Sequence, residues 1–296
     1  MPPRFSVLIP TYERAALLPA LLEAWAGIEP PRGGYEIILA DDGSSSPPMQ
    51  LVEFYASRIP LKFLQLPHGG VSATRQAALE VCQGEFALIT DDDCRPTPGL
   101  LRAYEDALKE FPERALGGPV INLLTGNIYS ETTQTITTYV AKAWNSGPDG
   151  PVFFTGSNFL LPRKALEKIG GFDRAWTSRT GEDRDLCRRW AEAGLSMAYV
   201  PEAVMGHAHA LDFPAFIRQH FHYGQGRSRS EVRRKKRGAG APAWSGPGFY
   251  AGLFLAPWRA FPPLKAAQAC LLTACSQVAT VCGSMQACLV HKRDGV

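Results

Sequence analysis

FSVLIPTYERAALLPALLEAW, residues 5–25, opens with a strand-sized apolar run and continues with apolar residues at helical spacing. The same pairing recurs along the chain. Apolar runs at residues 5–9, 35–40, 61–66 and 85–90 alternate with helix-period segments at 15–25, 48–57 and 71–82. This alternation favours a mostly parallel sheet with helices on both faces, and ligands of such folds bind beyond the carboxyl ends of the strands. The sequence therefore predicts an α/β fold with its site directly after the strands.

Polar clusters stand where these predicted strands end. Pro10-Thr11-Tyr12 follows the first strand, Asp41-Asp42-Gly43-Ser44 the second, and Asp91-Asp92-Asp93 the fourth. Parallel strands end at the same edge of a sheet, so we expect the three clusters to converge on one edge.

The Asp triplet is the sharpest of these signals. Three carboxylates at the end of a buried strand repel one another, and a cation would relieve that repulsion. Mg²⁺ and Mn²⁺ prefer oxygen ligands and often bind one or two carboxylates together with substrate phosphates, a role that suits Asp91 and Asp93. A solvated acidic loop or a helix cap is the alternative. An EF-hand is excluded, because the required Gly and Glu do not follow Asp91 in register.

Two further acidic motifs each allow two interpretations. Asp41 and Asp42 could bind a base or a ribose, or they could cap the next helix. Gly181-Glu182-Asp183 starts a predicted helix that Gly194 ends. An acid there could serve as a general base, or it could simply be favourable charge in a first helical turn.

Composition sets broad limits on function. With 296 residues, 45% of them hydrophobic and 20% charged, the chain resembles an ordinary globular protein. A net charge of +3 is too small to indicate nucleic-acid binding by the whole chain. The seven cysteines include no Cys-x-x-Cys pair, which argues against a disulfide framework and a zinc site. No secretory signal precedes the first short apolar run, so we expect a cytosolic catalytic part.

The alternation ends near Leu100, and the remaining chain is organised differently. We expect a helix to Phe111, a strand near residues 116–122, a polar Thr-rich stretch at 132–138, a strand at 157–161 and a short helix from Arg163. After residue 210 come a basic run at 227–237, a Gly/Pro/Ala-rich linker and an apolar tail. These shifts predict one domain over residues 1–210, divided near residue 122, and a helical region over 211–296.

The order of these motifs resembles that of the family 2 glycosyltransferases of the GT-A fold, and the likeness runs from Phe5 to His209. Residues 6–12 look like the family's opening strand and loop, although Glu13 stands where an Asn is frequent. The Asp41-Asp42 motif resembles the one whose first Asp contacts the nucleotide base, and residues 69–75 look like the family's Gly-rich turn and Arg-bearing helix. The resemblance implies nucleotide-sugar binding by Pro10, Thr11, Tyr12, Glu13, Asp41, Asp42 and Arg75.

Thr90-Asp91-Asp92-Asp93 resembles the family's D-x-D signature. The likeness implies that Asp93 is the direct ligand of Mn²⁺ or Mg²⁺, that Asp91 is its partner at the ribose or at metal-bound water, and that Asp92 also contacts the nucleotide-sugar. His207, in His207-x-His209, lies where some relatives supply a C-terminal metal or phosphate ligand. A strand with one solvated face is the alternative for that His pair.

The likeness continues through Gly156-Ser157-Asn158, residues 170–173 and Glu182-Asp183, which resemble the family's acceptor half. It implies Asp183 as the general base, with Glu182, Gly156, Ser157 and Asn158 at the acceptor. Residues 1–122 would then bind the nucleotide-sugar, with uridine as the family's commonest base, and residues 123–210 would bind the acceptor. The implied reaction is an inverting displacement by a hydroxyl of a glycan or lipid-linked acceptor, in cell-surface glycan or glycolipid synthesis.

Processive synthesis is not expected, because the Gln-x-x-Arg-Trp motif of processive synthases is absent. Residues 218–224, RQHFHYG, occupy the comparable region. Two other functions remain as alternatives. A sugar nucleotidyltransferase would need a Gly-rich, Arg/Lys-bearing loop after the first strand, where Pro10-Thr11-Tyr12 stands instead. A non-catalytic scaffold that binds sugar nucleotides is the other alternative, because a fold does not guarantee activity.

The tail suggests attachment to a membrane surface. Residues 266–290 carry no formal charge over 25 positions, but their Ala, Gln, Ser and Thr make them weakly hydrophobic. Basic residues on both sides oppose a single crossing, so an in-plane or re-entrant arrangement fits better. The aromatic residues typical of a headgroup-level anchor on anionic lipid are Trp244, Phe249, Tyr250, Phe254, Trp258 and Phe261. A helical pair packed on the catalytic domain or on a second subunit is the alternative, and a nucleic-acid patch is a further one.

Overall fold

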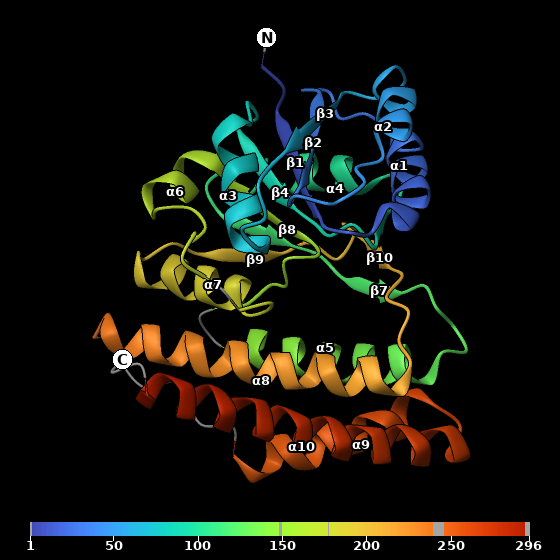
Figure 1. Ribbon diagram of the computed structural model, residues 1–296, viewed down its shortest axis with the longest axis vertical. Helices are drawn as coiled ribbons and strands as arrows, with labels where there is room; N and C mark the ends of the chain where they lie inside the picture. The colour runs from blue at the N-terminus through green and yellow to red at the C-terminus, as the bar shows by residue number, and fades with distance from the viewer. Residues whose placement is uncertain (1, 148–149, 177, 239–245, 294–296) are drawn as a thin grey trace. The chain divides into compact units, whose positions relative to one another are not determined.

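The computed structural model describes residues 2–147, 150–176, 178–238 and 246–293. They form two compact units whose segments alternate along the chain, which Figure 1 traces by colour. The first unit comprises residues 1–121, 154–177 and 189–208, and the second comprises 122–153, 178–188 and 209–296. The polar clusters at the strand ends therefore belong to the first unit, and Glu182 and Asp183 belong to the second.

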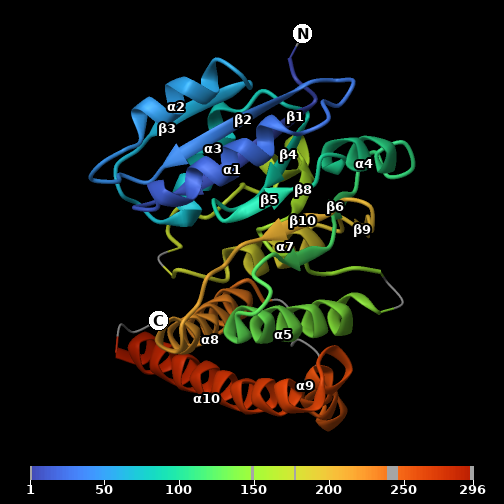
Figure 2. The ribbon, with the colours of Figure 1, turned by 90° about the vertical axis from the view of Figure 1, so that its right-hand side faces the viewer.

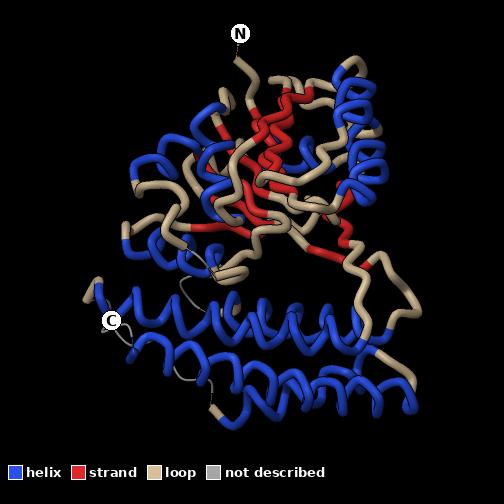
Figure 3. Tube along the Cα trace, in the orientation of Figure 1, coloured by secondary structure: helices blue, strands red, loops and turns tan. Residues whose placement is uncertain are grey.

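A seven-stranded sheet forms the centre of the first unit (Figure 3). Its order is β3-β2-β1-β4-β8-β6-β9, with bounds Leu61–Gln65, Tyr35–Asp41, Phe5–Thr11, Phe86–Ile89, Phe159–Pro162, Ala115–Gly117 and Met197–Tyr199. β8 is antiparallel to both of its neighbours, and the other paired strands are parallel. A smaller sheet has the order β5-β10-β7, with bounds Cys94–Pro96, Met205–His207 and Val120–Asn122. The predicted mostly parallel α/β sheet is confirmed.

Helices cover both faces of the large sheet. On one face α1 (Leu18–Ala26), α2 (Met49–Ala56) and α4 (Leu100–Ala107) share a buried cluster with alternate residues of β1, including Val7 and Ile9. Because side chains alternate between the two faces of a strand, the opposite face is free for α3 (Val71–Val81), which packs on β1 and β2. The short helices η1 (Ala15–Leu17) and α6 (Arg163–Lys168) follow β1 and β8. The helix-period segments of the sequence thus form the layers that the alternation predicts.

The second unit is helical within its described part (Figure 2). Its long helices are α5 (Ile128–Asn145), α8 (Phe213–Lys236), α9 (Pro247–Ala260) and α10 (Pro263–Arg293), and α7 (Glu182–Glu192) begins in it. The predicted helix between Gly181 and Gly194 is α7, and the expected C-terminal helical tail is confirmed. Trp244 of the predicted aromatic group lies outside the described residues.

The Thr-rich stretch at residues 132–138, for which the sequence indicated no element, lies inside helix α5. The Asn127 side chain caps that helix by accepting the N–H groups of Tyr129 and Ser130. Thr132 and Thr135 donate their hydroxyls to backbone carbonyls four residues earlier, at 2.7 and 2.8 Å. Their polar groups are therefore satisfied within the helix, which a composition-based interpretation cannot foresee.

Small residues allow α8 and α10 to approach closely. A Cβ added to Gly224 would clash with the Thr280 carbonyl, and one added to Gly283 would clash with the Phe221 carbonyl. Ser284 donates its hydroxyl to the Gly224 carbonyl at 3.0 Å. The small polar residues that make the tail weakly hydrophobic thus face α8, whereas large apolar residues elsewhere on α10 are exposed. By length and composition Pro263–Val290 could cross a membrane, and 33% of its apolar window is buried.

Candidate active site

The carboxyl ends of β1 and β2 bring the first two polar clusters together. Thr11 pairs with Asp41 in the strand register, and the Asp42 N–H donates to the Thr11 carbonyl at 2.9 Å. The Thr11 hydroxyl donates to the Asp92 carboxylate at 2.8 Å, which joins the third cluster to them. The expected convergence on one edge of the sheet is present.

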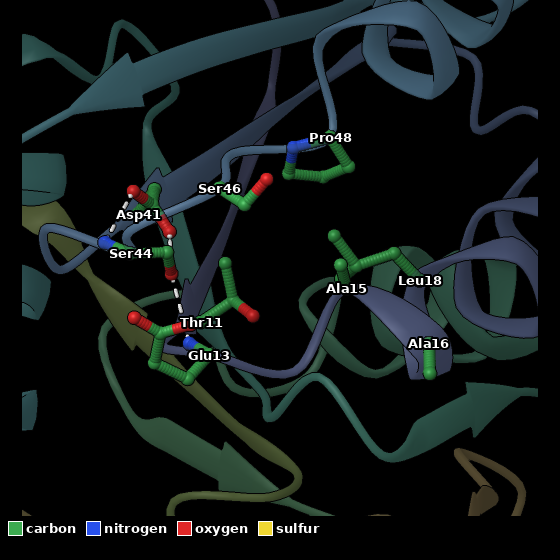
Figure 4. Close-up of a pocket in the computed structure, with 9 residues that line it drawn as sticks. All are labelled: Thr11, Glu13, Ala15, Ala16, Leu18, Asp41, Ser44, Ser46 and Pro48. Carbon is green, nitrogen blue, oxygen red and sulfur yellow. Dashed lines mark hydrogen bonds between the residues drawn. The ribbon is translucent and has the colours of Figure 1, made fainter.

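A cavity of about 220 Å³ opens beside this edge (Figure 4). Polar side chains from the two strand ends form one side, and apolar residues that follow β1 form the other. Its lining residues are Thr11, Glu13, Ala15, Ala16, Leu18, Asp41, Ser44, Ser46 and Pro48. Such a mixed lining suits a ligand with a flat apolar ring and a few polar atoms.

Asp41 and Glu13 are linked through the loop after β2. Asp41, which is fully buried, accepts the Ser44 N–H at 3.0 Å and also the Ser44 hydroxyl. The Glu13 N–H donates to the Ser44 hydroxyl at 2.8 Å, and the Glu13 carboxylate accepts the Ser45 N–H at 2.7 Å. Glu13 has a φ of 52°, in the left-handed region where Asn is enriched. The carboxylate contacts with the Ser loop hold this costly conformation in place.

Asp42 holds the Gly-rich turn before α3. Its carboxylate accepts the N–H groups of Gly69 at 2.8 Å and Gly70 at 3.0 Å. The His68 Nδ1 lies 3.0 Å from the same carboxylate. Gly43 has a φ of 82°, and a Cβ there would meet the His68 backbone nitrogen, so this turn requires glycine. Asp42 therefore fixes the turn before α3 and does not cap the next helix, α2, whose N-cap Pro48 makes no side-chain cap bond.

An aromatic pair stands at the same edge. The rings of Tyr12 and His68 stack with centroids 4.3 Å apart and planes 23° apart. Both are substantially exposed, so a planar ligand could stack on them. His68 was not predicted from the sequence, where its only signal is its position directly before Gly69-Gly70.

Arg75, Asp91, Gly156 and Ser157 form a second group. Arg75 is 2% exposed, and its guanidinium donates to Asp91 at 2.6 Å. The Ser157 hydroxyl donates to the other Asp91 oxygen at 2.8 Å. A Cβ at Gly156 would approach within 2.8 Å of the Arg75 guanidinium, so the small residue makes room for that side chain. The carboxylate of Asp91 therefore faces Arg75 in this structure.

Asn158 lies in the core beside this group. It is 1% exposed, and its carbonyl oxygen accepts the Tyr104 hydroxyl at 2.8 Å. Its amide donates to the Ala203 carbonyl at 2.8 Å. These contacts give Asn158 a structural role, so its expected place at the acceptor rests on the family resemblance alone.

Asp92 and Asp93 share one guanidinium. Arg14 places one nitrogen 2.7 Å from Asp92 and another 2.7 Å from Asp93. Burial raises the pKa of Asp92 to about 6, although the Arg14 charge opposes that rise. Arg14 was missed in the sequence, where it is one basic residue in the loop after the first strand.

Asp93 also meets His207 from β10, with the carboxylate oxygen and Nε2 3.1 Å apart. Burial disfavours the charged imidazole, but the hydrogen bond and charge of Asp93 outweigh it and raise the pKa of His207. The Cys94 Sγ lies in the same group, whose ligand atoms are all within 4.8 Å of one another. Burial, with the nearby Asp charges, holds the pKa of the Cys94 thiol well above its ordinary value, so it is a poor ligand.

The carboxylate of Asp93 and the imidazole of His207 could together bind a divalent cation. Two ligands about 2.1 Å from one ion and at right angles lie about 3 Å apart, which is close to the separation of Asp93 and His207. Carboxylate oxygen and imidazole nitrogen suit Mn²⁺, and Mg²⁺ accepts the oxygen more readily than the nitrogen. Asp93 and His207 would hold the ion, and its remaining positions would be open to oxygens of water or of a bound ligand.

Glu182 and Asp183 begin helix α7 in the second unit. The Asp183 carboxylate accepts the Arg184 N–H at 2.7 Å. The Arg184 guanidinium lies over the Trp144 ring, 4.7 Å from its centroid, and burial lowers its pKa to about 10 although the Asp183 charge opposes that change. Both acids stand in a first helical turn, and their roles at the acceptor stay predictions.

Comparison with known proteins identifies the family. A model of glycosyl transferase family group 2 matches residues 86–282. The chain belongs to this family. It is 28% identical over 242 residues to a pre-mycofactocin glycosyltransferase of Mycobacterium tuberculosis, covering 79% of this chain and 49% of that one. It is 25% identical over 235 residues to a chondroitin synthase of Escherichia coli, covering 68% and 34%. The family 2 chain thus spans about half or less of the length of these curated relatives.

Solved structures confirm the GT-A fold of this family 2 member. The mannosyltransferase PcManGT from Pyrobaculum calidifontis, in complex with GDP-Man and Mn²⁺, aligns with a TM-score of 0.64 and 20% identity, covering 98% of this chain and 87% of that one. Staphylococcus aureus TarS 1–349 in complex with UDP-GlcNAc aligns with a TM-score of 0.55 and 15% identity, covering 99% and 92%. At these identities the likeness concerns the fold.

Proposed function

We propose that the chain is an inverting, metal-dependent glycosyltransferase that moves a sugar from a nucleoside-diphosphate donor to an acceptor hydroxyl. The observation that carries the proposal is the contact of Asp93 with His207, 3.1 Å apart, at the sheet edge that also bears the Asp41 cavity. A cation site next to a cavity lined by two strand ends suits a nucleotide whose phosphates reach the ion.

The nucleotide would occupy the cavity, with Asp41 and Ser44 at its polar side and Tyr12 stacked on the base. Arg75, which is buried and pairs with Asp91, would bind donor oxygens through charge-assisted hydrogen bonds once the donor enters the site. A uridine nucleotide is the proposed donor, because relatives of the same fold include complexes with UDP and UDP-GlcNAc. The GDP-Man complex of PcManGT makes guanosine the comparison to test.

In the proposed reaction Asp183 takes the proton of an acceptor hydroxyl while that oxygen attacks the anomeric carbon. The bond from that carbon to the diphosphate breaks, and the configuration inverts. Asp93 and His207 would hold a divalent ion, which would supply Lewis acidity toward the departing diphosphate. Glu182 would orient the acceptor, for which we propose a glycan or lipid-linked hydroxyl in cell-surface glycan or glycolipid synthesis. Residues 1–210 would form the catalytic domain.

We also propose that the chain works in the cytoplasm, attached in-plane to an anionic membrane surface. Exposed apolar residues recur every seven positions along α10, at Leu264, Leu271, Val278 and Met285. Trp258 of α9, a helix that packs against α10, is 51% exposed. Between Glu231 and Asp294 the sequence contains basic residues but no acidic one. In space Lys265 pairs with Glu131 of α5, but the charged residues of α9 and of α10 before Asp294 are all basic, which suits anionic lipid better than a neutral partner surface.

Donor binding and hydrolysis test the enzymatic proposal. Thermal unfolding is measured with UDP, UDP-sugars, GDP and GDP-Man, each with and without Mn²⁺. Stabilisation by one nucleotide class that depends on Mn²⁺, together with slow Mn²⁺-dependent hydrolysis of its sugar donor, supports a transferase. Binding without any hydrolysis or transfer would favour the scaffold alternative, and absence of binding would refute the proposal.

A further inference from the structure

We infer that Arg14 neutralises the carboxylates of Asp92 and Asp93 when no metal ion is bound. When a divalent ion binds, the Arg14 guanidinium leaves these carboxylates and binds the donor diphosphate. The inference rests on the proposed function, because it concerns the same carboxylates. It adds a residue that neither the motif pattern nor the family resemblance indicated. Arg14 would therefore oppose binding of metal alone and favour binding of metal together with donor.

The geometry of the Arg14 ion pairs supports this exchange. Arg14 bridges two carboxylates, with one nitrogen 2.7 Å from Asp92 and the other 2.7 Å from Asp93. The side chains of Asp92 and Asp93 are each 3% exposed, whereas that of Arg14 is 41% exposed. The acids are therefore fixed in the protein, and the guanidinium approaches them from the solvent side.

Arg14 and a divalent ion would compete for the Asp93 carboxylate. One oxygen of Asp93 lies at Arg14 and the other lies 3.1 Å from His207. A divalent ion between Asp93 and His207 would stand beside the guanidinium, and the two positive charges would repel each other. The ion and Arg14 therefore compete for the same carboxylate, unless new negative charge arrives with the ligand.

The donor supplies that negative charge within reach of Arg14. Glu13, Ala15 and Ala16 line the cavity proposed for the nucleotide, so the backbone of Arg14 lies along its border. An arginine fork that fits two carboxylates also fits phosphate oxygens. Since the Arg14 side chain is 41% exposed, it can turn from Asp93 toward a diphosphate without unpacking the core.

The order of binding follows from this exchange. Metal alone must displace a cation from Asp93, whereas metal that arrives with a diphosphate offers the displaced cation a new partner. Arg14 thereby couples metal binding to donor binding, and coupling of this kind is reciprocal between the two ligands. The structure assigns to Arg14 the role of a positioning residue that discourages a metal-loaded site without donor.

Mn²⁺ titrations of the full chain test the inference. Binding of Mn²⁺ is followed by electron paramagnetic resonance, first alone and then with UDP, for the wild type, Arg14→Ala and Arg14→Lys. For Arg14→Ala we expect Mn²⁺ alone to bind about tenfold tighter and UDP at saturating Mn²⁺ to bind about tenfold weaker, since a charge-assisted hydrogen bond is lost. Arg14→Lys, which keeps the charge but not the fork, should lie between them.

The opposite signs of the two changes distinguish exchange from damage. A variant that merely disturbs the fold would weaken both ligands, and that result would overturn the inference. Arg14→Gln, which keeps the length and hydrogen-bond donors without the charge, replaces Arg14→Ala if the latter does not fold. If the wild type binds Mn²⁺ and the variant binds both Mn²⁺ and UDP with unchanged affinity, Arg14 does not couple the two ligands, and the proposed metal site is still supported. If neither protein binds Mn²⁺, the proposed metal site falls and the inference falls with it.

Discussion

Arg75 and Asp91 form an ion pair of 2.6 Å in which the arginine is 2% exposed and the aspartate side chain 30%. The arginine is thus fixed in the interior, and the aspartate side chain remains partly exposed to solvent. A buried guanidinium that loses a carboxylate partner is costly, so the pair has consequences for both stability and donor binding.

Removing the Asp91 carboxylate should therefore destabilise the protein. Asp91→Ala is expected to lower the free energy of unfolding by about 3 kcal/mol, because the buried Arg75 then loses the carboxylate to which it donates. Arg174→Ala is the matched control, since its 2.5 Å pair with Glu80 is exposed on both sides and should be worth less than about 1 kcal/mol. Urea unfolding of both variants measures the difference. Equal losses of unfolding free energy in the two variants would show that the buried Arg75–Asp91 pair contributes no more than an exposed pair.

The two histidines of His207-x-His209 should differ in metal binding. His207→Ala removes a nitrogen 3.1 Å from Asp93, and we expect its Mn²⁺ affinity to fall at least about tenfold. His209→Ala is the control two residues along the chain, outside the group of candidate ligand atoms. Isothermal titration with Mn²⁺ in the presence of UDP measures both. Similar affinities for the two variants would remove His207 from the metal site.

Buried His220 should make the protein sensitive to acid. The ring is 1% exposed against Phe216 and Tyr223, and burial lowers the pKa of His220 to about 4. The unfolded chain protonates this group near pH 6.5, so its stabilising effect is complete above that pH and is lost as the pH falls toward 4. The loss amounts to about 3 kcal/mol at pH 4.

A variant isolates the contribution of His220 to this acid sensitivity. His220→Phe should flatten the dependence of the unfolding free energy on pH between 6.5 and 4, because the aromatic pocket then holds no titrating group. His222→Gln, two residues further along α8 and only half-buried, serves as the control. Urea unfolding at several pH values measures the slopes. An unchanged slope in His220→Phe would assign the acid sensitivity to other groups.

The edge of the sheet could be predicted because its signals are local. Each cluster follows directly after an apolar run, and parallel strands bring such clusters together whatever lies between them. The reversal of β8 could not be predicted, because it depends on pairing with β4 and β6 from distant parts of the chain. Helix α5 was missed because its threonines bond to their own backbone, which weakens their polar signal.

Individual site residues were harder to predict than the edge itself. Asp41 and Asp93 were predicted as site residues because an acidic residue after a strand is conspicuous. Arg14 and His68 were missed, since their contacts depend on the path of loops and not on a spacing in the sequence. Asn158 was expected at the acceptor, but a side chain next to the site can equally be turned into the core.

Asp183 is expected to matter for chemistry and not for nucleotide binding. Asp183→Asn removes the proposed base while keeping the shape of the helix start, so transfer should fall by about 10²-fold to 10⁴-fold. Mn²⁺-dependent binding of UDP should stay within about twofold of the wild type. Glu192→Gln, an exposed acid at the other end of α7, is the control. Unchanged turnover in Asp183→Asn would refute the assignment of the base.

The exposed apolar residues of α10, Leu264, Leu271, Val278 and Met285, should determine whether the protein binds lipid. Leu271 and Val278 are 68% and 64% exposed, so Leu271→Gln with Val278→Gln removes apolar surface without opening the interface with α8. The wild type is expected to float with vesicles containing anionic lipid and much less with neutral ones, and the double variant should remain with the soluble fraction. Val81→Gln, also exposed but on α3, is the control. Equal flotation of wild type and double variant would discard the membrane surface. A wild type that is dimeric by light scattering, floats with no vesicle and becomes monomeric in the double variant would assign these apolar residues to a second copy.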